Sequence, residues 1–288
     1  MLSTMERPRV LVCGHVTLDR YGDVLLPGGS AYYAGRAYHA LGALVRVATA
    51  AGPDLPRAAL AGLEEHVAPA PRTTIFVNRY AADGRRAQSV EAVAPPLDPA
   101  LLPPSWRTTD LLHLAPVAGE VDLHAWRSAV AARLVGLGVQ GAVRAVLPDG
   151  KVVQPRWEPD PADLATLGAA CLGEDDLVGQ GDLLSRLAAS VPVVAFTRGA
   201  QGCDVIVRGR TRRVGAYPTH AVDPTGAGDV FAAGFLLALA RGEDPVDAAR
   251  LGAAAASIVV EARAGEALAR LGEAHARVRH VSPAGQAR

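Results

Sequence analysis

The chain has little cysteine, no excess charge of either sign and no long uncharged apolar run. Its three cysteines, Cys13, Cys171 and Cys203, are far apart and each has apolar neighbours. Three isolated cysteines argue against both a disulfide framework and a zinc site. We therefore expect buried thiols in a reducing compartment, and a cytoplasmic protein.

Charge balance excludes two classes of partner. Basic and acidic side chains number 29 each in 288 residues. That balance removes the long-range attraction that nucleic-acid or anionic-membrane binding needs, so neither partner is expected. Residues 1–8 are short and polar, unlike a signal peptide, and no uncharged apolar run reaches 18 residues. Any phosphate that the protein binds must be held by local groups.

Short apolar runs alternate with segments of helical spacing along the chain. Strands are predicted over 10–13, 45–50, 111–114 and 193–197, and helices over 30–41, 121–137, 226–241 and from 245 onward. Such alternation is typical of a mostly parallel sheet covered by helices on both faces. We expect one α/β domain over residues 1–288, because half of the side chains are hydrophobic and no polar linker divides the chain.

A small β element is predicted within this domain at about 72–94. Segments 73–80 and 88–93 alternate around Asp83-Gly84, a dipeptide that favours tight hairpin turns. Such a hairpin can serve as a lid. The eight residues 20–27 are too few for long additional lid strands, so the lid should be small.

Residues 223–229, Asp-Pro-Thr-Gly-Ala-Gly-Asp, combine an anion site with a base. Gly226, Ala227 and Gly228 leave their backbone amides unshielded, and a helix begins there whose first N–H groups have no internal partner. Asp229 lies just inside that helix. It should be ionised at neutral pH, from a reference pKa of about 3.9, and can accept a proton from an alcohol. A plain loop-to-helix junction explains Gly-x-Gly-Asp alone, but the full motif favours phosphoryl transfer.

Three candidate segments, 14–19, 199–202 and 223–229, each follow a predicted strand. Ligands of open α/β sheets bind at the carboxyl ends of the strands. These segments should therefore converge on one edge of the sheet.

The 223–229 motif resembles the signature of the ribokinase-like carbohydrate kinases, also called the phosphofructokinase-B (pfkB) family. The resemblance covers roughly residues 9–265 and is strongest over 195–262. It implies a three-layer sandwich with a β lid and an ATP-dependent, magnesium-requiring transfer of phosphate to an alcohol. It also implies that Asp229 is the catalytic base, that the amides of 226–228 stabilise the transferring group, and that Asp223 and Thr225 lie at a site for a K⁺-type cation.

Further motifs extend the resemblance to the nucleotide side. Residues 197–202 resemble the family's turn beneath the ATP phosphates, which implies nucleotide binding by Thr197, Gly199 and Gly202. The segment 253–261, which contains Ala256, resembles the helix that lines the adenine pocket.

On the acceptor side, Asp19 and the pair Gly28-Gly29 resemble the family's substrate-binding positions. Taken alone, the glycine pair also fits a simple turn and Asp19 a solvated carboxylate. Within the family the chain is most similar to myo-inositol kinases, notably over 74–80, 140–144 and 222–260. Arg144 and Asn78 are additional substrate-binding candidates, although Arg144 is also compatible with an ordinary surface position.

Two positions depart from the family pattern. Tyr33 stands where the family usually has an asparagine, so the substrate pocket must differ from that of ribokinases. The family's Asn-x-x-Glu segment would fall at 173–176, where Gly173 replaces the amide. Asp176 can still supply a carboxylate for Mg²⁺, or simply be part of an acidic helix start.

Two other functions are compatible with the sequence. A nucleoside kinase of the same fold could stack a base on Tyr32, Tyr33 or Tyr38, and a catalytically silent relative could act as a regulatory subunit. A dinucleotide-dependent dehydrogenase is excluded, because residues 12–19 lack Gly-x-Gly-x-x-Gly. The sequence leaves a homodimer open.

Overall fold

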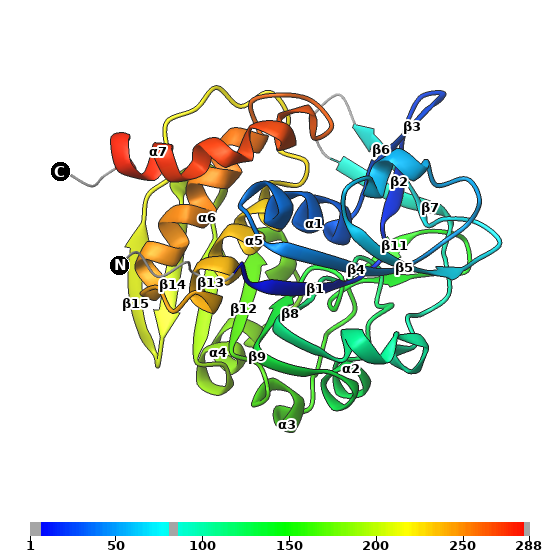
Figure 1. Ribbon diagram of the computed structural model, residues 1–288, viewed down its shortest axis with the longest axis horizontal. Helices are drawn as coiled ribbons and strands as arrows, with labels where there is room; N and C mark the ends of the chain where they lie inside the picture. The colour runs from blue at the N-terminus through cyan, green and yellow to red at the C-terminus, as the bar shows by residue number, and fades with distance from the viewer. Residues whose placement is uncertain (1–6, 81–85, 285–288) are drawn as a thin grey trace.

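The computed structural model describes residues 7–80 and 86–284, and a nine-stranded sheet forms its centre (Figure 1). The strand order is β15-β14-β13-β12-β9-β8-β1-β4-β5. Every neighbouring pair from β13 to β5 is parallel. At the other edge β14 pairs antiparallel with β13, and β15 pairs antiparallel with β14. The strands are β1 (Arg9–Cys13), β4 (Leu44–Ala51), β5 (Glu64–Pro69), β8 (Thr108–Leu114), β9 (Ala131–Gly138), β12 (Ala169–Gly173), β13 (Val193–Thr197), β14 (Cys203–Val207) and β15 (Arg210–Val214).

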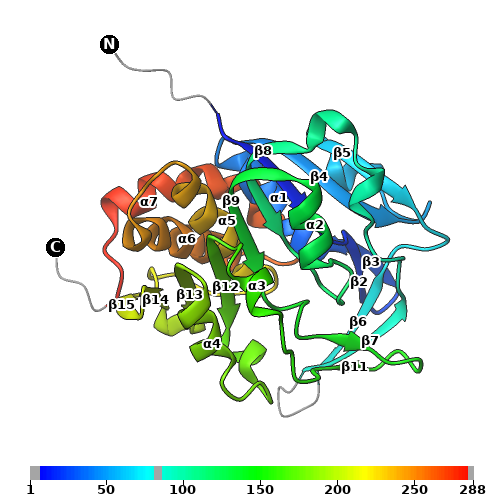
Figure 2. The ribbon, with the colours of Figure 1, turned by 90° about the horizontal axis from the view of Figure 1, so that it is seen from below.

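Helices cover both faces of this sheet, which confirms the expected three-layer sandwich (Figure 2). One face carries α1 (Ser30–Ala40), α5 (Ala227–Ala240) and α6 (Pro245–Val259), with η6 (Glu266–Glu273) and α7 (Ala274–His280) against α6. The other face carries α2 (Leu123–Ala129), α3 (Pro161–Leu164) and α4 (Leu183–Ser190). None of the helices in the described ranges is both long and apolar enough to cross a membrane.

Helix α5 is buried along most of its length. Residues 230–238 are all buried, as expected for a helix that is apolar on every side. Gly234 faces Gly252 of α6 so closely that a Cβ on Gly234 would stand 3.0 Å from the Gly252 Cα. This close packing fixes α5, and therefore its amino terminus, relative to the sheet.

A separate four-stranded sheet lies beside the central one, in the order β3-β2-β6-β7. Its strands are β2 (Thr17–Tyr21), β3 (Val24–Gly28), β6 (Ile75–Tyr80) and β7 (Arg86–Ala92). The expected hairpin is therefore only half of this sheet, because residues 20–27 form most of a second hairpin. The expected turn at Asp83-Gly84 lies outside the described residues.

The small sheet packs on one side against a short hairpin. Phe76 of β6 and Val90 of β7 form a buried cluster with Val117, and β10 (Ala145–Val146) and β11 (Val152–Val153) cover it. The Val90 N–H also donates to the Gly150 carbonyl at 2.7 Å. These contacts anchor the small sheet to the segment that carries Arg144.

The predicted helix over 121–137 is wrong in its second half. Helix α2 ends at Ala129, and the chain then enters β9 between β8 and β12. A Cβ on Gly136 of β9 would stand 2.5 Å from Leu236 Cδ1 of α5. This segment is a strand because α5 approaches it closely and because it pairs with two neighbouring strands. Local residue spacing shows neither of these contacts.

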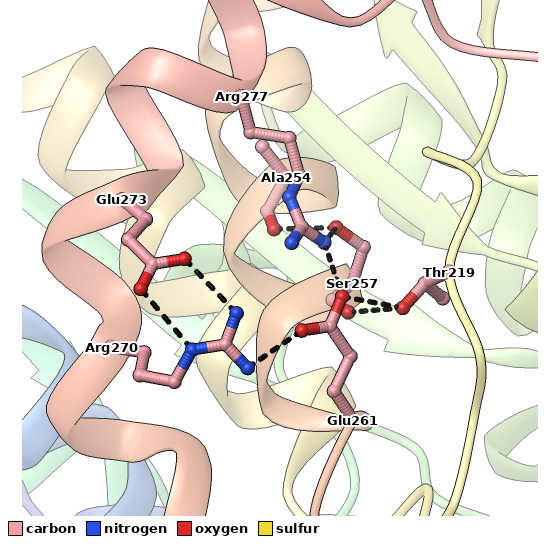
Figure 3. Close-up of polar contacts among 7 residues, drawn as sticks. All are labelled: Thr219, Ala254, Ser257, Glu261, Arg270, Glu273 and Arg277. Carbon is pink, nitrogen blue, oxygen red and sulfur yellow. Dashed lines mark hydrogen bonds and ion pairs between the residues drawn. The ribbon is translucent and has the colours of Figure 1, made fainter.

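A polar network braces the carboxyl end of α6 (Figure 3). Glu261 accepts hydrogen bonds from Thr219 (2.9 Å), Arg270 (2.8 Å) and Arg277 (2.8 Å), and Arg277 also donates to Ser257 Oγ (2.9 Å). Burial opposes the charge on Glu261, but the hydrogen bonds, led by that from Arg277, outweigh it, so the Glu261 pKa lies below its usual value. The network therefore holds α6 to η6, to α7 and to the loop that carries Thr219.

We expect Glu261→Gln to lower the free energy of unfolding by about 1 to 2 kcal/mol at pH 7, because charge-assisted hydrogen bonds are lost. A lowered folded-state pKa contributes stability above the unfolded pKa, near 4.5, and that contribution disappears as the pH falls through the folded value. Denaturant unfolding at pH 7 and pH 3.5 measures both. The exposed Glu273, which pairs with Arg270 at 3.0 Å, provides the control Glu273→Gln, for which little change is expected. Equal losses in the two variants would contradict the bracing role.

Candidate active site

A cavity of about 560 Å³ lies where the two sheets meet. Its walls come from the carboxyl ends of strands β8, β9, β12 and β13, from the small sheet and from the amino termini of α1 and α5. The predicted site residues that line it are Asp19, Gly29, Arg144, Asp176, Thr197, Gly199, Thr225, Gly226, Gly228 and Asp229. Segments far apart in the sequence thus meet around one space.

Asp229 lies in the first turn of α5, facing this cavity. Its carboxylate forms a hydrogen bond with Ser30, the first residue of α1. Burial raises the pKa of Asp229 to about 6; the Ser30 hydrogen bond and the Arg144 charge oppose this rise, and Asp176 adds to it. The expectation of an ordinary aspartate pKa is therefore wrong: the group remains mostly ionised at pH 7 but can be protonated in mild acid.

The loop before α5 ends at Gly226, the N-cap of the helix, whose φ of +78° is the left-handed conformation that glycine adopts most easily. Gly226 and Gly228 line the cavity, and Ala227 begins the helix between them. Asp223 braces the loop without lining the cavity. One of its oxygens accepts from the Thr225 N–H at 2.9 Å, and the other from the Ala264 N–H at 3.0 Å.

Asp19 and Gly29 form another part of the cavity wall, and Gly28 does not line the cavity. Asp19, on β2, is buried and lines the cavity. Gly28 lies behind it, where a Cβ would stand 2.4 Å from Asp19 Oδ2, and Gly29 has φ +85° at the N-cap of α1. Neither glycine leaves room for a side chain, since a Cβ on Gly29 would stand 2.6 Å from the His15 carbonyl oxygen.

Arg144 and Asp176 supply opposite charges on the same cavity. The Arg144 charge favours the ionised forms of Asp229 and Asp176. Asp176 follows β12 in the short helix η4 (Glu174–Leu177) and accepts the Gly173 N–H at 2.8 Å. Burial nevertheless raises the Asp176 pKa. This carboxylate is not the solvated helix start that the sequence also allowed, because it is only 5% exposed.

Several predicted residues do not line the cavity. Asn78 accepts a hydrogen bond from Gln88 Nε2 at 3.0 Å, and Gln88 rather than Asn78 faces the cavity. Gly202, with φ +87°, closes the turn after β13, where its N–H donates to the Gly199 carbonyl at 3.0 Å. Ala256 packs against the hydrophobic core from α6.

Other cavity residues were not selected from the sequence. The sequence does hold a signal for Ser30: it directly follows the glycine pair at the start of a predicted helix. A side chain at that position can face the same cavity as the first backbone amides of the helix. Phe76, Gln88 and His113 lie on strands, and strand alternation alone does not reveal which face meets a ligand. His113 is fully buried, and desolvation lowers its pKa to about 3, so it is neutral.

Comparison with known families agrees with this geometry. The pfkB family of carbohydrate kinases matches residues 169–269, a range that includes Asp176, the turn 197–202 and the motif 223–229. This segment is a pfkB family carbohydrate kinase domain. The expected family is confirmed over this segment.

The length of the match differs between individual relatives. Cytidine kinase of Thermococcus kodakarensis is 27% identical over 273 residues, 84% of this chain and 92% of that protein. The bifunctional protein HldE of Caulobacter is 37% identical over 94 residues, 32% of this chain, and inositol 3-kinase of rice is 48% identical over 59 residues, 20% of this chain. The chain spans only 19% and 15% of the length of these last two proteins.

Solved structures share the fold over nearly the whole chain. A pyrophosphate-dependent myo-inositol-1 kinase, converted by two substitutions into a myo-inositol-3 kinase, superposes with a TM-score of 0.73 at 20% identity. The superposition covers 91% of this chain and 98% of that structure. At this identity the similarity establishes the fold, including the three-layer arrangement.

We expect Asp229→Asn to raise the melting temperature at pH 7.5. The folded-state pKa, about 6, lies above the usual 3.8, so between these values the folded protein holds a proton that the unfolded chain has lost. Stability therefore falls as the pH rises through this window, and the cost is complete above it. Asparagine carries no charge to desolvate. Melting curves at pH 7.5 and pH 4 should show a gain that shrinks in acid; a gain independent of pH would contradict the raised pKa.

Proposed function

We propose that the protein is a kinase that transfers the γ-phosphate of ATP to a hydroxyl of a small polyol, cyclitol or sugar. The convergence of Asp229, Asp19 and the Gly226 to Gly228 backbone around one cavity is the observation that carries the proposal. A carboxylate suited to accept a proton, a carboxylate suited to hold hydroxyls and backbone amides suited to an anion would then share one cavity. A catalytically silent relative would have no physical need of this combination.

In the proposed reaction Asp19 holds acceptor hydroxyls and Asp229 takes the proton of the reacting hydroxyl. The acceptor oxygen forms a bond to the γ-phosphorus as the bond between that phosphorus and the bridging β,γ-oxygen breaks, and ADP leaves with the electron pair. The α5 amides and Arg144 stabilise the negative charge on the transferring group. Thr197 and Gly199, at the end of β13, line the side of the cavity assigned to the donor phosphates.

The proposal includes Mg²⁺ and a monovalent cation. Within the described residues no three His, Cys, Asp or Glu side chains are grouped to hold a metal ion. Mg²⁺ commonly binds through one or two carboxylates and the substrate phosphates, and Glu174, Asp175 and Asp176 all line the cavity. That donor set fits a nucleotide-borne Mg²⁺, which would neutralise phosphate charge. A K⁺ ion would share the oxygens of Asp223 and Thr225.

ATP is the proposed donor because a ribokinase of the same fold has been solved with ribose and ATP. Other proteins of this fold are pyrophosphate-dependent kinases. Measuring turnover with each donor at equal magnesium distinguishes the two. Higher kcat/KM with pyrophosphate than with ATP would contradict the ATP part of the proposal and leave the acceptor part intact.

A nucleoside kinase is the second candidate, favoured by the match to cytidine kinase along 92% of that protein's length. The two candidates differ in the acceptor alone. Competition between inosine or cytidine and myo-inositol for the same enzyme separates them. Inhibition by nucleosides at lower concentration than by inositols would favour the second candidate.

We expect Asp229→Asn to reduce acceptor-dependent ADP release by roughly a hundredfold or more, because the general base is lost. Nucleotide binding should persist, since Asp229 acts on the acceptor. A coupled ADP assay with inositols, sugars, sugar acids and nucleosides, and calorimetric titration with ATP, test both statements. Unchanged turnover would remove Asp229 from the mechanism, and failure of the wild type to bind either donor would refute the kinase proposal.

The pH dependence provides an independent test of the base. Because Asp229 must be ionised and has a pKa of about 6, kcat/KM should be level above pH 7 and fall about tenfold per unit below pH 6. Rates measured from pH 5 to 8.5, with an assay that does not itself depend on pH, follow this change. A profile that stays flat down to pH 5 would exclude a base with this pKa.

A further inference from the structure

Tyr33 forms a buried wall of the candidate site. It lies one turn after Ser30 on α1, so the two side chains project from the same side of the helix. Ser30 hydrogen-bonds to Asp229, and Tyr33 lines the same cavity while being only 2% exposed. The phenol ring therefore stands beside the proposed base and is not free to turn into solvent.

The ring is held between two glycines. A Cβ on Gly226 would stand 2.3 Å from Tyr33 Cδ1, and a Cβ on Gly265 would stand 3.1 Å from Tyr33 Cε1. Both glycines have positive φ, +78° for each. The ring thus fills the space left by the absent side chains, and it cannot move far without displacing the N-cap of α5 or the loop before η6.

The charges of two carboxylates influence the pKa of the Tyr33 hydroxyl. Burial raises the Tyr33 pKa, and the charges of Asp19 and Asp229 contribute to that rise. The phenol is therefore neutral and lies within electrostatic reach of both groups. Under the proposed function these are the groups that hold and deprotonate the acceptor, so Tyr33 borders the acceptor itself.

The part of the cavity wall that comes from the small sheet is also firmly packed. Phe76 is 4% exposed and belongs to the buried cluster with Val90 and Val117 beneath the small sheet. Gln88, the polar neighbour on this wall, is hydrogen-bonded to Asn78. An acceptor must therefore fit between the Tyr33 ring and the small sheet.

We propose that Tyr33 is the specificity-determining wall of the acceptor pocket, and that its ring restricts acceptors to molecules with a single small ring. The inference rests on the proposed kinase function and deepens it. A nucleoside, with a base attached to its sugar, needs the space that Tyr33 fills. Replacing the ring by a small side chain opens that space next to Asp19 and Asp229.

The test compares kcat and KM of wild type, Tyr33→Ala and Tyr33→Phe with the best single-ring acceptor, with inosine and with cytidine. In Tyr33→Ala the ratio of nucleoside to single-ring kcat/KM should rise tenfold or more, mainly through a lower KM for the nucleoside and a higher KM for the small acceptor. Tyr33→Phe keeps the ring, and should keep the wild-type order of acceptors.

Tyr32→Ala is the matched control. Tyr32 packs edge to face on Tyr33, with ring centroids 5.2 Å apart, and is absent from the cavity lining. Its removal should leave the selectivity ratio unchanged. Melting temperatures of all variants show whether the fold persists, and Tyr33→Leu, which opens less space, replaces Tyr33→Ala if the latter does not fold; a smaller rise in the same ratio is then expected.

Three outcomes would overturn the assignment. An equal fall in kcat for every acceptor, with KM unchanged, would mean that the ring only supports Gly226. A wild-type preference for nucleosides would refute the size restriction directly. No turnover by the wild type with any acceptor would refute the proposed function, and this inference with it, whereas normal wild-type turnover with an unchanged ratio in Tyr33→Ala refutes the inference alone.

Discussion

The carboxylate of Asp229 is held, partly buried, at the amino terminus of α5, and the elements around the cavity keep it there. Water would stabilise its charge better than the cavity does, which is why its pKa rises to about 6. The Ser30 hydrogen bond, the Arg144 charge and the helix terminus compensate in part. The helix behind Asp229, in which residues 230–238 are buried, fixes the position of this unfavourable charge.

The surrounding elements supply the groups that stabilise the charge of Asp229 in the cavity. The helix α1 brings Ser30, the loop after β9 brings Arg144, and the left-handed Gly226 turns the chain so that α5 can begin at the cavity. The small sheet covers the same space and is tied to the Arg144 segment through Phe76 and its buried neighbours. Electrostatic contacts within a partly buried site of this kind are stronger than the same contacts in water.

Much of this arrangement could be predicted from the sequence, because some signals are local. Asp229 inside a helix start and the glycines before it follow from residue type and order alone. The α/β class follows from the alternating apolar segments, although β9 was mistaken for helix because its identity depends on α5 lying close to Gly136. Other features depend on contacts between distant segments, which residue spacing does not reveal. They are the raised pKa of Asp229, the position of Gln88 rather than Asn78 on the cavity wall, and the packing of Tyr33 on Gly226.

Under the proposed function this partly buried carboxylate takes the proton of an alcohol that receives a phosphoryl group. Phosphorus-31 NMR of wild type and Asp229→Asn, each mixed with ATP, Mg²⁺ and the acceptor panel, tests it without a coupling enzyme. In the wild type a phosphomonoester resonance should grow as the γ-phosphate signal falls, and in the variant at most a trace of it should form over the same time. A phosphomonoester that grows equally fast in both proteins would contradict the account.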